Sequence, residues 1–305
     1  APAKPGQYVA AYSEVVAANA AMWGAKEAGI FQKNGLDIDV RLIESSLSIG
    51  ALVSGQVQMA GVGGSEALAA AVEGADVSVV GIMGPVWDFK LEVTPDIHTG
   101  QDLKGKKLAV SRFGSTSDTA TRLGLQKLGL QPDKDVSLVQ VGSLQARTSA
   151  MQSGAVQGSM TLPPDDVTLE DQGFHSLLDL ADYNIPASNN SISLQGAWLN
   201  AHHAEAQKYV DSIVQSVARL KKDRPFALQV MQKYMKLDDQ RLLGVAYDYY
   251  IGRITPVLPF PKPEQFATSI DLLSEKNPRA KGFDLTKLVD PSLVQSAADR
   301  GLDKG

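Results

Sequence analysis

The sequence contains no cysteine and few aromatic residues, which make up 6% of its 305 positions. Without cysteine the chain can form no disulfide, zinc ribbon or iron–sulfur cluster and has no cysteine nucleophile. It also lacks an apolar run of about 18 residues, the length that a membrane-spanning helix requires. Basic residues do not predominate, because 29 Lys and Arg stand against 34 Asp and Glu. This balance argues against a nucleic-acid partner, since proteins that bind nucleic acid usually carry a basic surface.

The signatures of several enzyme classes are also missing. No glycine-rich loop ends in Gly-Lys-Ser or Gly-Lys-Thr, and neither a nucleophile elbow nor an HExxH zinc motif occurs. Residues 61–66 begin like a dinucleotide-binding loop, but the third glycine is absent. No metal-ligand spacing relates the four histidines, which are His98, His175, His202 and His203. The sequence therefore predicts a protein that is not an enzyme and that holds no metal and no cofactor.

What is present is an ordinary globular composition, with 44% hydrophobic and 21% charged residues. A chain of this length corresponds to one large or two medium domains. The first six residues, APAKPG, include no initiator methionine and lead directly into an apolar run. They are typical of the mature end that remains after a signal peptide has been removed, and a sequence trimmed for expression is the alternative.

Short apolar runs alternate with helical patterns through the first two thirds of the chain. The predicted strands are residues 8–12, 36–42, 57–62, 77–83, 108–110, 136–141, 156–160, 177–180 and 192–199. The predicted helices between them are residues 17–31, 49–53, 65–72, 116–128 and 145–152, with a further helix after Pro163 and Pro164. Beyond residue 200, helical spacing is found at residues 204–220, 225–235, 239–251 and 264–273. Alternation of this kind predicts parallel βαβ units in an α/β fold, followed by a helical tail.

One eight-residue segment occurs twice. Residues 51–58, ALVSGQVQ, match residues 150–157, AMQSGAVQ, at five positions. In both copies a predicted helix ends at Ser-Gly and a strand begins within two residues. The repeat predicts two similar α/β units, and a common helix–strand corner that arose twice is the alternative.

Hydroxyl-bearing and glycine residues follow three predicted strands. The clearest case is Gly114, Ser115 and Thr116, which come directly before a predicted helix, and residues 63–66 and 45–48 are similar. Free backbone N–H groups at a helix N-terminus bind anions, and the carboxyl ends of strands are where open α/β sheets bind ligands. Together the three segments favour a binding crevice, whereas each alone is equally explained as a helix N-cap.

Aromatic and arginine side chains are further candidates for a ligand pocket. The aromatic candidates are Trp87, which follows a predicted strand, Trp198, in the strand that leaves the second unit, and Tyr247, which shares a predicted helix with Tyr249 and Tyr250. Trp and Tyr offer flat apolar surfaces with one polar group, although a core position is the alternative for each. Arg41, Arg112 and Arg147 are able to hold an anion through two parallel hydrogen bonds. Of these, Arg41 alternates with the apolar face of its strand and is expected to be exposed.

Several segments together resemble one protein family. They are AMWGAKEAGIF at 21–31 with NGLD at 34–37, ALVSGQVQ at 51–58, DLKGKKLAV at 102–110 and GST at 114–116. In this order they resemble the periplasmic substrate-binding proteins of the nitrate/sulfonate/taurine class, which are the solute receptors of ABC importers. The resemblance spans residues 10–200. Departures occur at Ala21, Gly24 and Gln58, and residues 13–19 are unlike the sulfonate and nitrate examples, so the substrate stays open.

The resemblance implies a two-lobed type II periplasmic-binding-protein fold, in which each lobe is a mostly parallel sheet flanked by helices. Lobe 1 would hold residues 1–91 and 196–305, and lobe 2 residues 92–195. The chain would cross at a hinge near 91–93 and again near 193–196. Ligand would bind between the lobes, and hinge closure would bury it.

The function implied is that of a periplasmic, secreted receptor that works as a monomer. It would deliver a small organic anion, either a carboxylate or a sulfonate, to an ABC permease in the inner membrane. The expected ligand-binding residues are Ser13, Asn19, Ser46, Gly64, Ser65, Trp87, Gly114, Ser115, Thr116, Thr161, Gln195, Trp198 and Tyr247. A binding protein or enzyme for a thiamine precursor or another heterocycle, and a ligand sensor module, are the alternatives.

Overall fold

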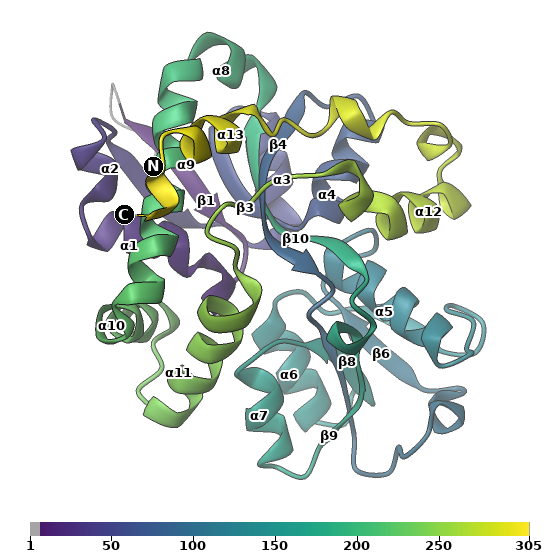
Figure 1. The fold of residues 1–305 in the computed structure, drawn as a ribbon. Coiled ribbons are helices and arrows are strands. Elements are labelled where there is room, and N and C mark those ends of the chain that lie inside the picture. The colour runs from purple at the N-terminus through teal and green to yellow at the C-terminus, as the bar shows by residue number, and fades with distance from the viewer. Residues whose placement is uncertain (1–6, 305) are drawn as a thin grey trace.

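Two five-stranded sheets flanked by helices form the computed structural model, which describes residues 7–304 except the side chains of Ser45 and Ser46 (Figure 1). The first sheet has the strand order β2-β1-β3-β10-β4. Its strands are β1 (Tyr8–Tyr12), β2 (Ile38–Leu42), β3 (Met59–Val62), β4 (Val77–Val86) and β10 (Pro186–Gln195). β1 is parallel to β2 and β3, whereas β10 is antiparallel to β3 and β4. Only β10 therefore runs against the other strands of this sheet.

The second sheet repeats this plan with the order β7-β6-β8-β5-β9. Its strands are β5 (Lys90–Val93), β6 (Lys107–Val110), β7 (Ser137–Gln140), β8 (Gly158–Thr161) and β9 (His175–Asp179). β6 is parallel to β7 and β8, and β5 is antiparallel to β8 and β9. The predicted α/β class with mostly parallel sheets is confirmed.

The repeated octets form the same corner in both sheets. Gly55 and Gly154 each follow a helix and have φ angles of 75° and 74°. The side chain of Gln58 accepts a hydrogen bond from Val9 N at 2.9 Å and donates to Gly55 O at 3.1 Å. Gln157 makes the equivalent pair of hydrogen bonds in the second sheet, at 3.2 and 3.3 Å. Each glutamine thus fastens the corner to the neighbouring strand, so the sequence repeat corresponds to a structural one.

The chain passes between the sheets at two short links. The first link, residues 87–89, joins β4 to β5, and the second, residues 180–185, joins β9 to β10. The crossings were expected near residues 91–93 and 193–196. In the structure, residues 91–93 belong to β5, and residues 193–196 span the junction of β10 with α8. The expected positions were those that the resemblance implied, and hydropathy alone does not mark the first link. Trp87 and Phe89 are both buried, so hydropathy does not fall at the first link.

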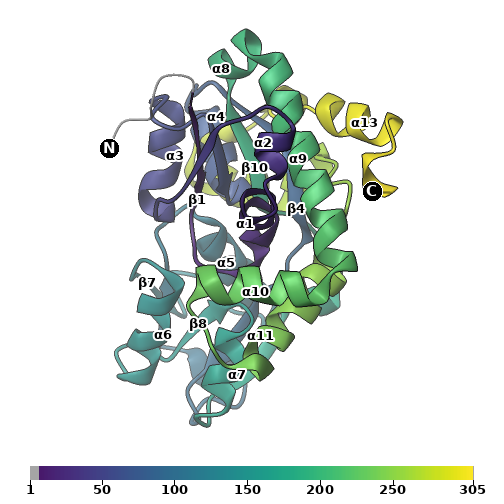
Figure 2. The ribbon, with the colours of Figure 1, turned by 90° about the vertical axis from the view of Figure 1, so that its left-hand side faces the viewer.

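Helices cover both sheets and form the last third of the chain. Those that follow strands are α1 (Ala20–Glu27), α2 (Ile30–Lys33), α3 (Ser45–Val53), α4 (Gly64–Val72), α5 (Thr116–Lys127), α6 (Leu144–Gln152) and α7 (Asp165–Glu170). Those after β10 are α8 (Gly196–Ala201), α9 (His203–Lys222), α10 (Arg224–Met235), α11 (Gln240–Tyr247), α12 (Ala267–Lys276) and α13 (Ser292–Asp299). α9 packs on α1 and α13, and α10 and α11 extend toward α7 (Figure 2). Across residues 7–304, none of the helices has the length and apolar character needed to cross a membrane.

Three predicted elements differ from the structure. The helix expected over residues 17–31 is interrupted at Gly29, whose φ of 65° ends α1 and starts α2. The strand expected over residues 192–199 stops at Gln195, so Trp198 lies in α8. The helix expected over residues 239–251 changes at Asp248 into a π-helical turn, Asp248–Ile254. Each of these positions is decided by packing that hydrophobic spacing does not record.

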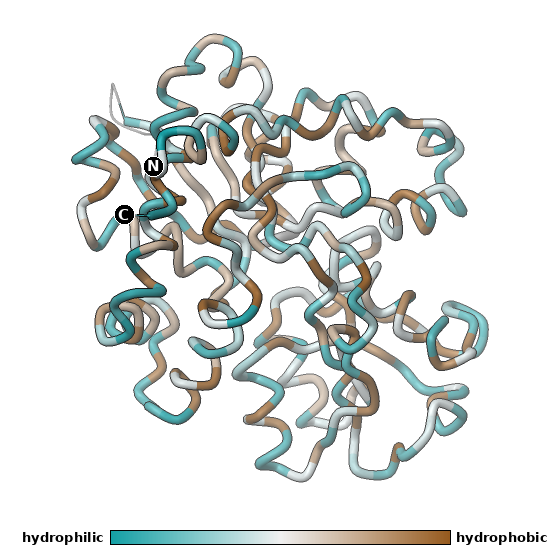
Figure 3. Tube along the Cα trace, viewed as in Figure 1, coloured by the Kyte–Doolittle hydropathy of each residue, from teal (hydrophilic) through white to brown (hydrophobic). Residues whose placement is uncertain are grey.

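Hydrophobic packing is continuous from one sheet to the other. One cluster of buried residues includes Val80 of β4, Leu91 of β5 and Leu108 of β6. Hydrophobic segments accordingly occur in both halves of the molecule, where Figure 3 shows them in brown. The two sheets therefore share a core beneath the links.

Candidate functional site

A cavity opens between the two sheets, beside the carboxyl ends of β1, β3, β6 and β8. It contains about 660 Å³ of empty space, including its open mouth. The lining residues are Ser13, Glu14, Val16, Ala18, Asn19, Gly63, Glu66, Met83, Gly84, Asp88, Phe89, Ser111, Thr116, Ser117, Arg147, Leu162, Asn189, Asn190, Tyr250 and Ile254.

Three of the expected ligand-binding residues lie on this wall. Ser13 and Asn19 come from the segment that follows β1, and Thr116 is the first residue of α5. Asn19 is buried, and its Nδ2 donates to Glu14 O at 2.8 Å, which fixes the loop. The rule that ligands bind at the carboxyl ends of parallel strands therefore places these three residues on one cavity.

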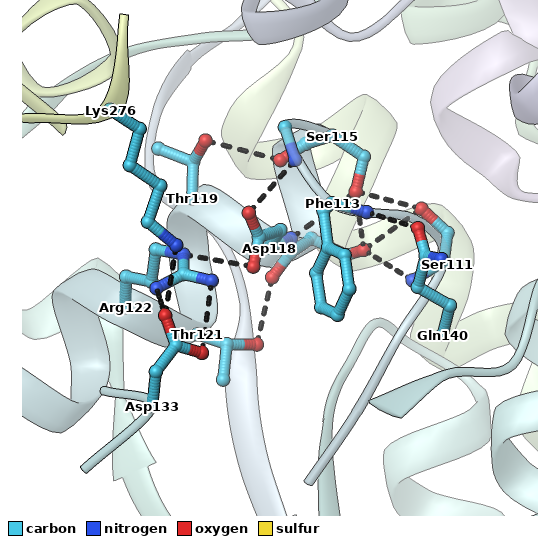
Figure 4. A network of polar contacts seen from close by, with 12 residues as sticks. Ser111, Phe113, Ser115, Asp118, Thr119, Thr121, Arg122, Asp133, Gln140 and Lys276 are labelled. Atoms are coloured by element: carbon cyan, nitrogen blue, oxygen red, sulfur yellow. Dashed lines mark hydrogen bonds and ion pairs between the residues drawn. The ribbon is translucent and has the colours of Figure 1, made fainter. Parts of the chain in front are cut away.

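The N-terminus of α5 is satisfied by the protein's own groups. Ser115 is fully buried, and its Oγ caps the helix by accepting a hydrogen bond from Asp118 N at 3.3 Å. Gly114 N donates to Asp118 Oδ2 at 2.9 Å, and the Ser115 hydroxyl contacts that of Ser111 at 2.8 Å (Figure 4). Gly114 and Ser115 do not line the cavity. The groups that were expected to bind an anion instead make hydrogen bonds at the start of the helix.

Thr116 is held from the opposite side of the cavity. Its N–H and Oγ1 both donate to Glu66 Oε2, at 3.2 and 2.7 Å. Burial raises the pKa of Glu66, although the Arg112 guanidinium and the Thr116 hydrogen bond oppose the rise. Since Glu66 belongs to α4 and Thr116 to α5, a protein carboxylate occupies the predicted anion site and joins the two sides of the cavity.

Gly64 and Ser65, also expected at the site, pack away from the cavity. A Cβ on Gly64 would lie 2.1 Å from Ser188 Oγ, so glycine is required for the close approach of α4 to β10. The Ser65 hydroxyl contacts the Ser269 hydroxyl at 2.9 Å, toward α12. Their neighbours Gly63 and Glu66 line the cavity instead. The side chain of Ser46 lies outside the described residues.

The three expected aromatic residues do not line the cavity. Trp87 is buried in the core at 1% exposure. Trp198 packs against Tyr8, with the ring centroids 5.2 Å apart, because α8 directs it away from the sheet junction. Tyr247 donates to Leu220 O at 3.1 Å, and Arg224 lies over its ring at 4.5 Å. For Trp87 and Trp198, position near a junction in the sequence did not distinguish a core residue from a pocket residue.

Two expected polar residues near the links also serve the backbone. Thr161 is buried at the end of β8, and its Oγ1 donates to Lys90 O at 3.4 Å. Gln195 caps α8, since its Oε1 accepts from Trp198 N at 2.9 Å. Both residues satisfy local hydrogen bonds and lie off the cavity wall.

A buried arginine lies on the cavity wall with hydrogen-bonding capacity to spare. Arg147 of α6 is 0% exposed, and its Nη1 donates to Gly142 O at 2.9 Å. Glu14 Oε1 lies 3.6 Å from Nη1. Nε and Nη2 have no hydrogen-bond partner among residues 7–304. Burying such donors unpaired is costly, and a planar guanidinium fits carboxylate or sulfonate oxygens. Arg41, by contrast, pairs with Asp39 at 2.6 Å on β2, away from the cavity.

A second group of polar atoms lies at the links. Asp88 of the first link is 4% exposed and accepts a hydrogen bond from Asn189 Nδ2. Burial raises the pKa of Asp88 to about 7, which Asn189 opposes and the nearby Asp179 carboxylate reinforces. Asn189 Oδ1 and the Tyr250 hydroxyl are buried without a hydrogen-bond partner in the described part of the chain. This part of the wall presents acceptors, whereas Arg147 presents donors.

Sequence reasoning missed several residues on the wall, namely Glu14, Glu66, Asp88, Asn189 and Tyr250. Asp88 carried a usable signal, because it is a single carboxylate within the apolar stretch 77–91. Burial of a carboxylate in an apolar segment is expensive and points to a functional role. Glu66 belongs to residues 63–66, a segment that the sequence already marked as a candidate, although Gly64 and Ser65 were the residues chosen from it. Glu14, Asn189 and Tyr250 gave no such signal, since only folding brings them together.

Apolar side chains complete the wall. Met83, Phe89, Leu162 and Ile254 line the cavity beside the polar groups. Among residues 7–304, no cluster of three His, Asp or Glu side chains could hold a metal ion. The arrangement therefore suits a small molecule with an apolar body and a few polar groups.

Comparison with known proteins places the chain in a family. Residues 17–223, more than half of the chain, match the NMT1/THI5 like family, and the chain belongs to it. Among curated protein sequences, none matches significantly. A protein of Bordetella bronchiseptica RB50 has a similar structure, with a TM-score of 0.84 at 19% identity, over 97% of this chain and 98% of that chain.

Two further structures with similar folds are binding proteins. The periplasmic aliphatic sulphonate binding protein SsuA from Escherichia coli gives a TM-score of 0.76 at 21% identity, over 94% of this chain and 92% of that chain. The periplasmic nitrate-binding protein NrtA from Synechocystis PCC 6803 gives 0.75 at 15% identity, over 97% of this chain and 89% of that chain. The fold is therefore that of the periplasmic binding proteins, as the resemblance implied.

Proposed function

We propose that this protein is a periplasmic solute receptor, which captures a small organic anion between its two sheets and delivers it to an ABC permease in the inner membrane. The observation that carries the proposal is the cavity with Arg147, whose Nε and Nη2 are buried and unpaired. A ligand carboxylate or sulfonate would accept both hydrogen bonds at once. Support for the transport role comes from the family and from similar folds whose names describe sulphonate and nitrate binding.

The same proposal divides the molecule into two lobes that close on the ligand. One lobe carries the first sheet and the helices after β10, and the other carries β5–β9 with α5–α7. The links at 87–89 and 180–185 are the proposed hinge, because they are the two short connections by which the chain passes between the sheets. In this view the protein works as a monomer, since each cavity wall comes from a single chain.

The proposed ligand is an organic carboxylate or sulfonate of modest size. Its anionic group would bind Arg147, with Ser13 and Asn19 close by on the opposite wall. Its body would lie against Phe89, Met83 and Leu162. The cavity binds the ligand unchanged in this proposal, so mass spectrometry should recover it without turnover.

The test is a thermal-shift screen against aliphatic and aromatic carboxylates, sulfonates, phosphonates, nitrate and bicarbonate. A ligand at about 100 times its dissociation constant adds about 2.7 kcal/mol to stability. We expect a shift confined to organic anions. R147Q should weaken binding of the best anion about 10- to 100-fold, because hydrogen bonds to charged groups contribute about 1.5–3 kcal/mol.

R41Q is the matched control, since Arg41 pairs with Asp39 on β2 and does not line the cavity. It should bind the anion as the parent does. Equal affinity in the parent and R147Q would contradict the proposed role of Arg147. Absence of a shift with every organic anion, also after unfolding and refolding to release retained ligand, would contradict the ligand class.

A further inference from the structure

The charges on the cavity wall do not suit a simple anion. Three carboxylates line the cavity, Glu14, Glu66 and Asp88, and Arg147 is the lining residue that opposes them. Glu14 is already placed 3.6 Å from Arg147, and Glu66 is held by both donors of Thr116. Asp88 differs from these two, because its side-chain partner is the neutral amide of Asn189. The carboxylate of Asp88 is therefore the one that a ligand group can still neutralise.

Two more polar groups lie on the wall with Asp88, an amide oxygen that accepts and a hydroxyl that can accept or donate. Asn189 is 5% exposed, and its Oδ1 is buried with no hydrogen-bond partner in the described structure. Tyr250 is 1% exposed, and its hydroxyl is equally unpaired within residues 7–304. An amide oxygen can only accept, and leaving it buried and unpaired costs free energy. The side-chain amide of Asn189 is oriented with Nδ2 toward Asp88, to which it donates a hydrogen bond, so that Oδ1 is left to accept one from a ligand.

The backbone around this group is held firmly. Tyr249 donates from its hydroxyl to Asp88 O at 2.7 Å, which fastens the π-helical turn to the first link. Asn189 is the fourth residue of β10, the strand that follows the second link. The first link and β10 thus each contribute one acceptor to the same wall, close to where the chain passes between the two sheets.

From this arrangement we infer that Asp88, Asn189 and Tyr250 form a second ligand subsite, which accepts an N–H donor, so that the cargo is an amino-bearing organic acid. The inference rests on the proposed receptor function and adds the chemistry of the other end of the ligand. An ammonium group carries several N–H donors and one positive charge. It can therefore satisfy Asn189 Oδ1 and neutralise Asp88 together, whereas a hydroxyl has one donor and no charge.

The experiment compares matched acids by isothermal titration calorimetry. The sets are γ-aminobutyrate, γ-hydroxybutyrate and butyrate; ε-aminocaproate and caproate; and meta-(aminomethyl)benzoate and meta-toluate. The parent protein should bind at least one amino acid of the series about tenfold or more tightly than its counterpart without the amine. D88N should reduce that ratio to about one, because an amide cannot neutralise an ammonium group.

D182N makes the same change of charge at an exposed position and should keep the parent's ratio. Circular dichroism and the melting temperature establish that each variant is folded. Equal affinity for amino and unsubstituted acids in the parent, or a ratio that survives in D88N, would overturn the second subsite and leave the receptor function standing. Binding of no acid in any set would overturn the subsite for an amino-bearing carboxylate, whereas the receptor function is tested separately by the thermal-shift screen, which includes sulfonates.

Discussion

At the scale of single residues, the second sheet contains a buried carboxylate that weakens the fold at high pH. Glu92 of β5 is 0% exposed, and neither of its carboxylate oxygens has a hydrogen-bond partner among the described residues. Burial raises the pKa of Glu92 to about 8, and the carboxylates of Glu170 and Asp166 add to the rise. Because the folded state binds this proton more tightly than the unfolded state, stability falls as pH rises from the ordinary pKa of 4.5 to about 8.

E92Q should therefore be more stable than the parent at alkaline pH. We expect the difference in the free energy of unfolding to be small near about pH 5 and to reach about 4 kcal/mol near about pH 9, since burial raises the pKa from 4.5 to about 8 and each pKa unit corresponds to about 1.4 kcal/mol. Urea unfolding across this range measures it. E275Q, at an exposed carboxylate, is the control and should follow the parent. A constant difference between E92Q and the parent at all pH values would show that Glu92 is not protonated in the fold.

Residues whose roles are local were predictable from the sequence, and residues whose roles depend on the packing of distant segments were not. Gln58 and Gln157 make the same hydrogen bonds because the same octet surrounds them. Ser13 and Thr116 follow strands, and that position alone brought them to the cavity. Trp198 gave the same junction signal, yet α8 turns its ring toward Tyr8.

At the scale of elements, the start of α5 contains one residue that caps the helix, Ser115, and one that lines the cavity, Thr116. Ser115 caps the helix from a fully buried position, so S115A should lower stability by about 1 kcal/mol, the usual cost of a lost N-cap. For a chain of this size that corresponds to a fall of about 2–4 °C in the melting temperature. Affinity for the best organic anion should stay as in the parent. Loss of affinity without loss of stability would show that the hydroxyl of Ser115 contacts ligand after all.

Element order was largely evident in the sequence, because single helices alternate with short apolar runs. The segments that were misjudged are those in which neighbours decide the conformation. β5 was not predicted, because its four residues, Lys90–Val93, give too short an alternation of polar and apolar side chains to mark a strand. α1 and α2 were predicted as one helix, because Gly29 separates them and glycine as a residue type also occurs inside helices.

At the scale of the whole molecule, the two sheets are held together by polar contacts at several points around the cavity. Glu66 and Thr116 join α4 to α5, and Lys276 of α12 lies 2.8 Å from Asp133, which belongs to the second sheet's half. Figure 4 shows that Asp133 also binds Arg122 of α5, at 2.7 Å. Arg241 of α11 pairs with Asp171 beyond α7. Of these contacts, the Glu66–Thr116 hydrogen bond lies on the cavity wall, which also carries Arg147 and Asp88.

The central claim is that an organic anion binds Arg147 in this space, and proton–nitrogen NMR of the arginine side chain tests it most directly. Arg147 Nε has no hydrogen-bond partner among residues 7–304, so its N–H resonance, assigned by its loss in R147K, should move downfield as the anion is titrated. The change in this chemical shift should follow the calorimetric binding curve. A resonance that stays in place while the anion binds would contradict it.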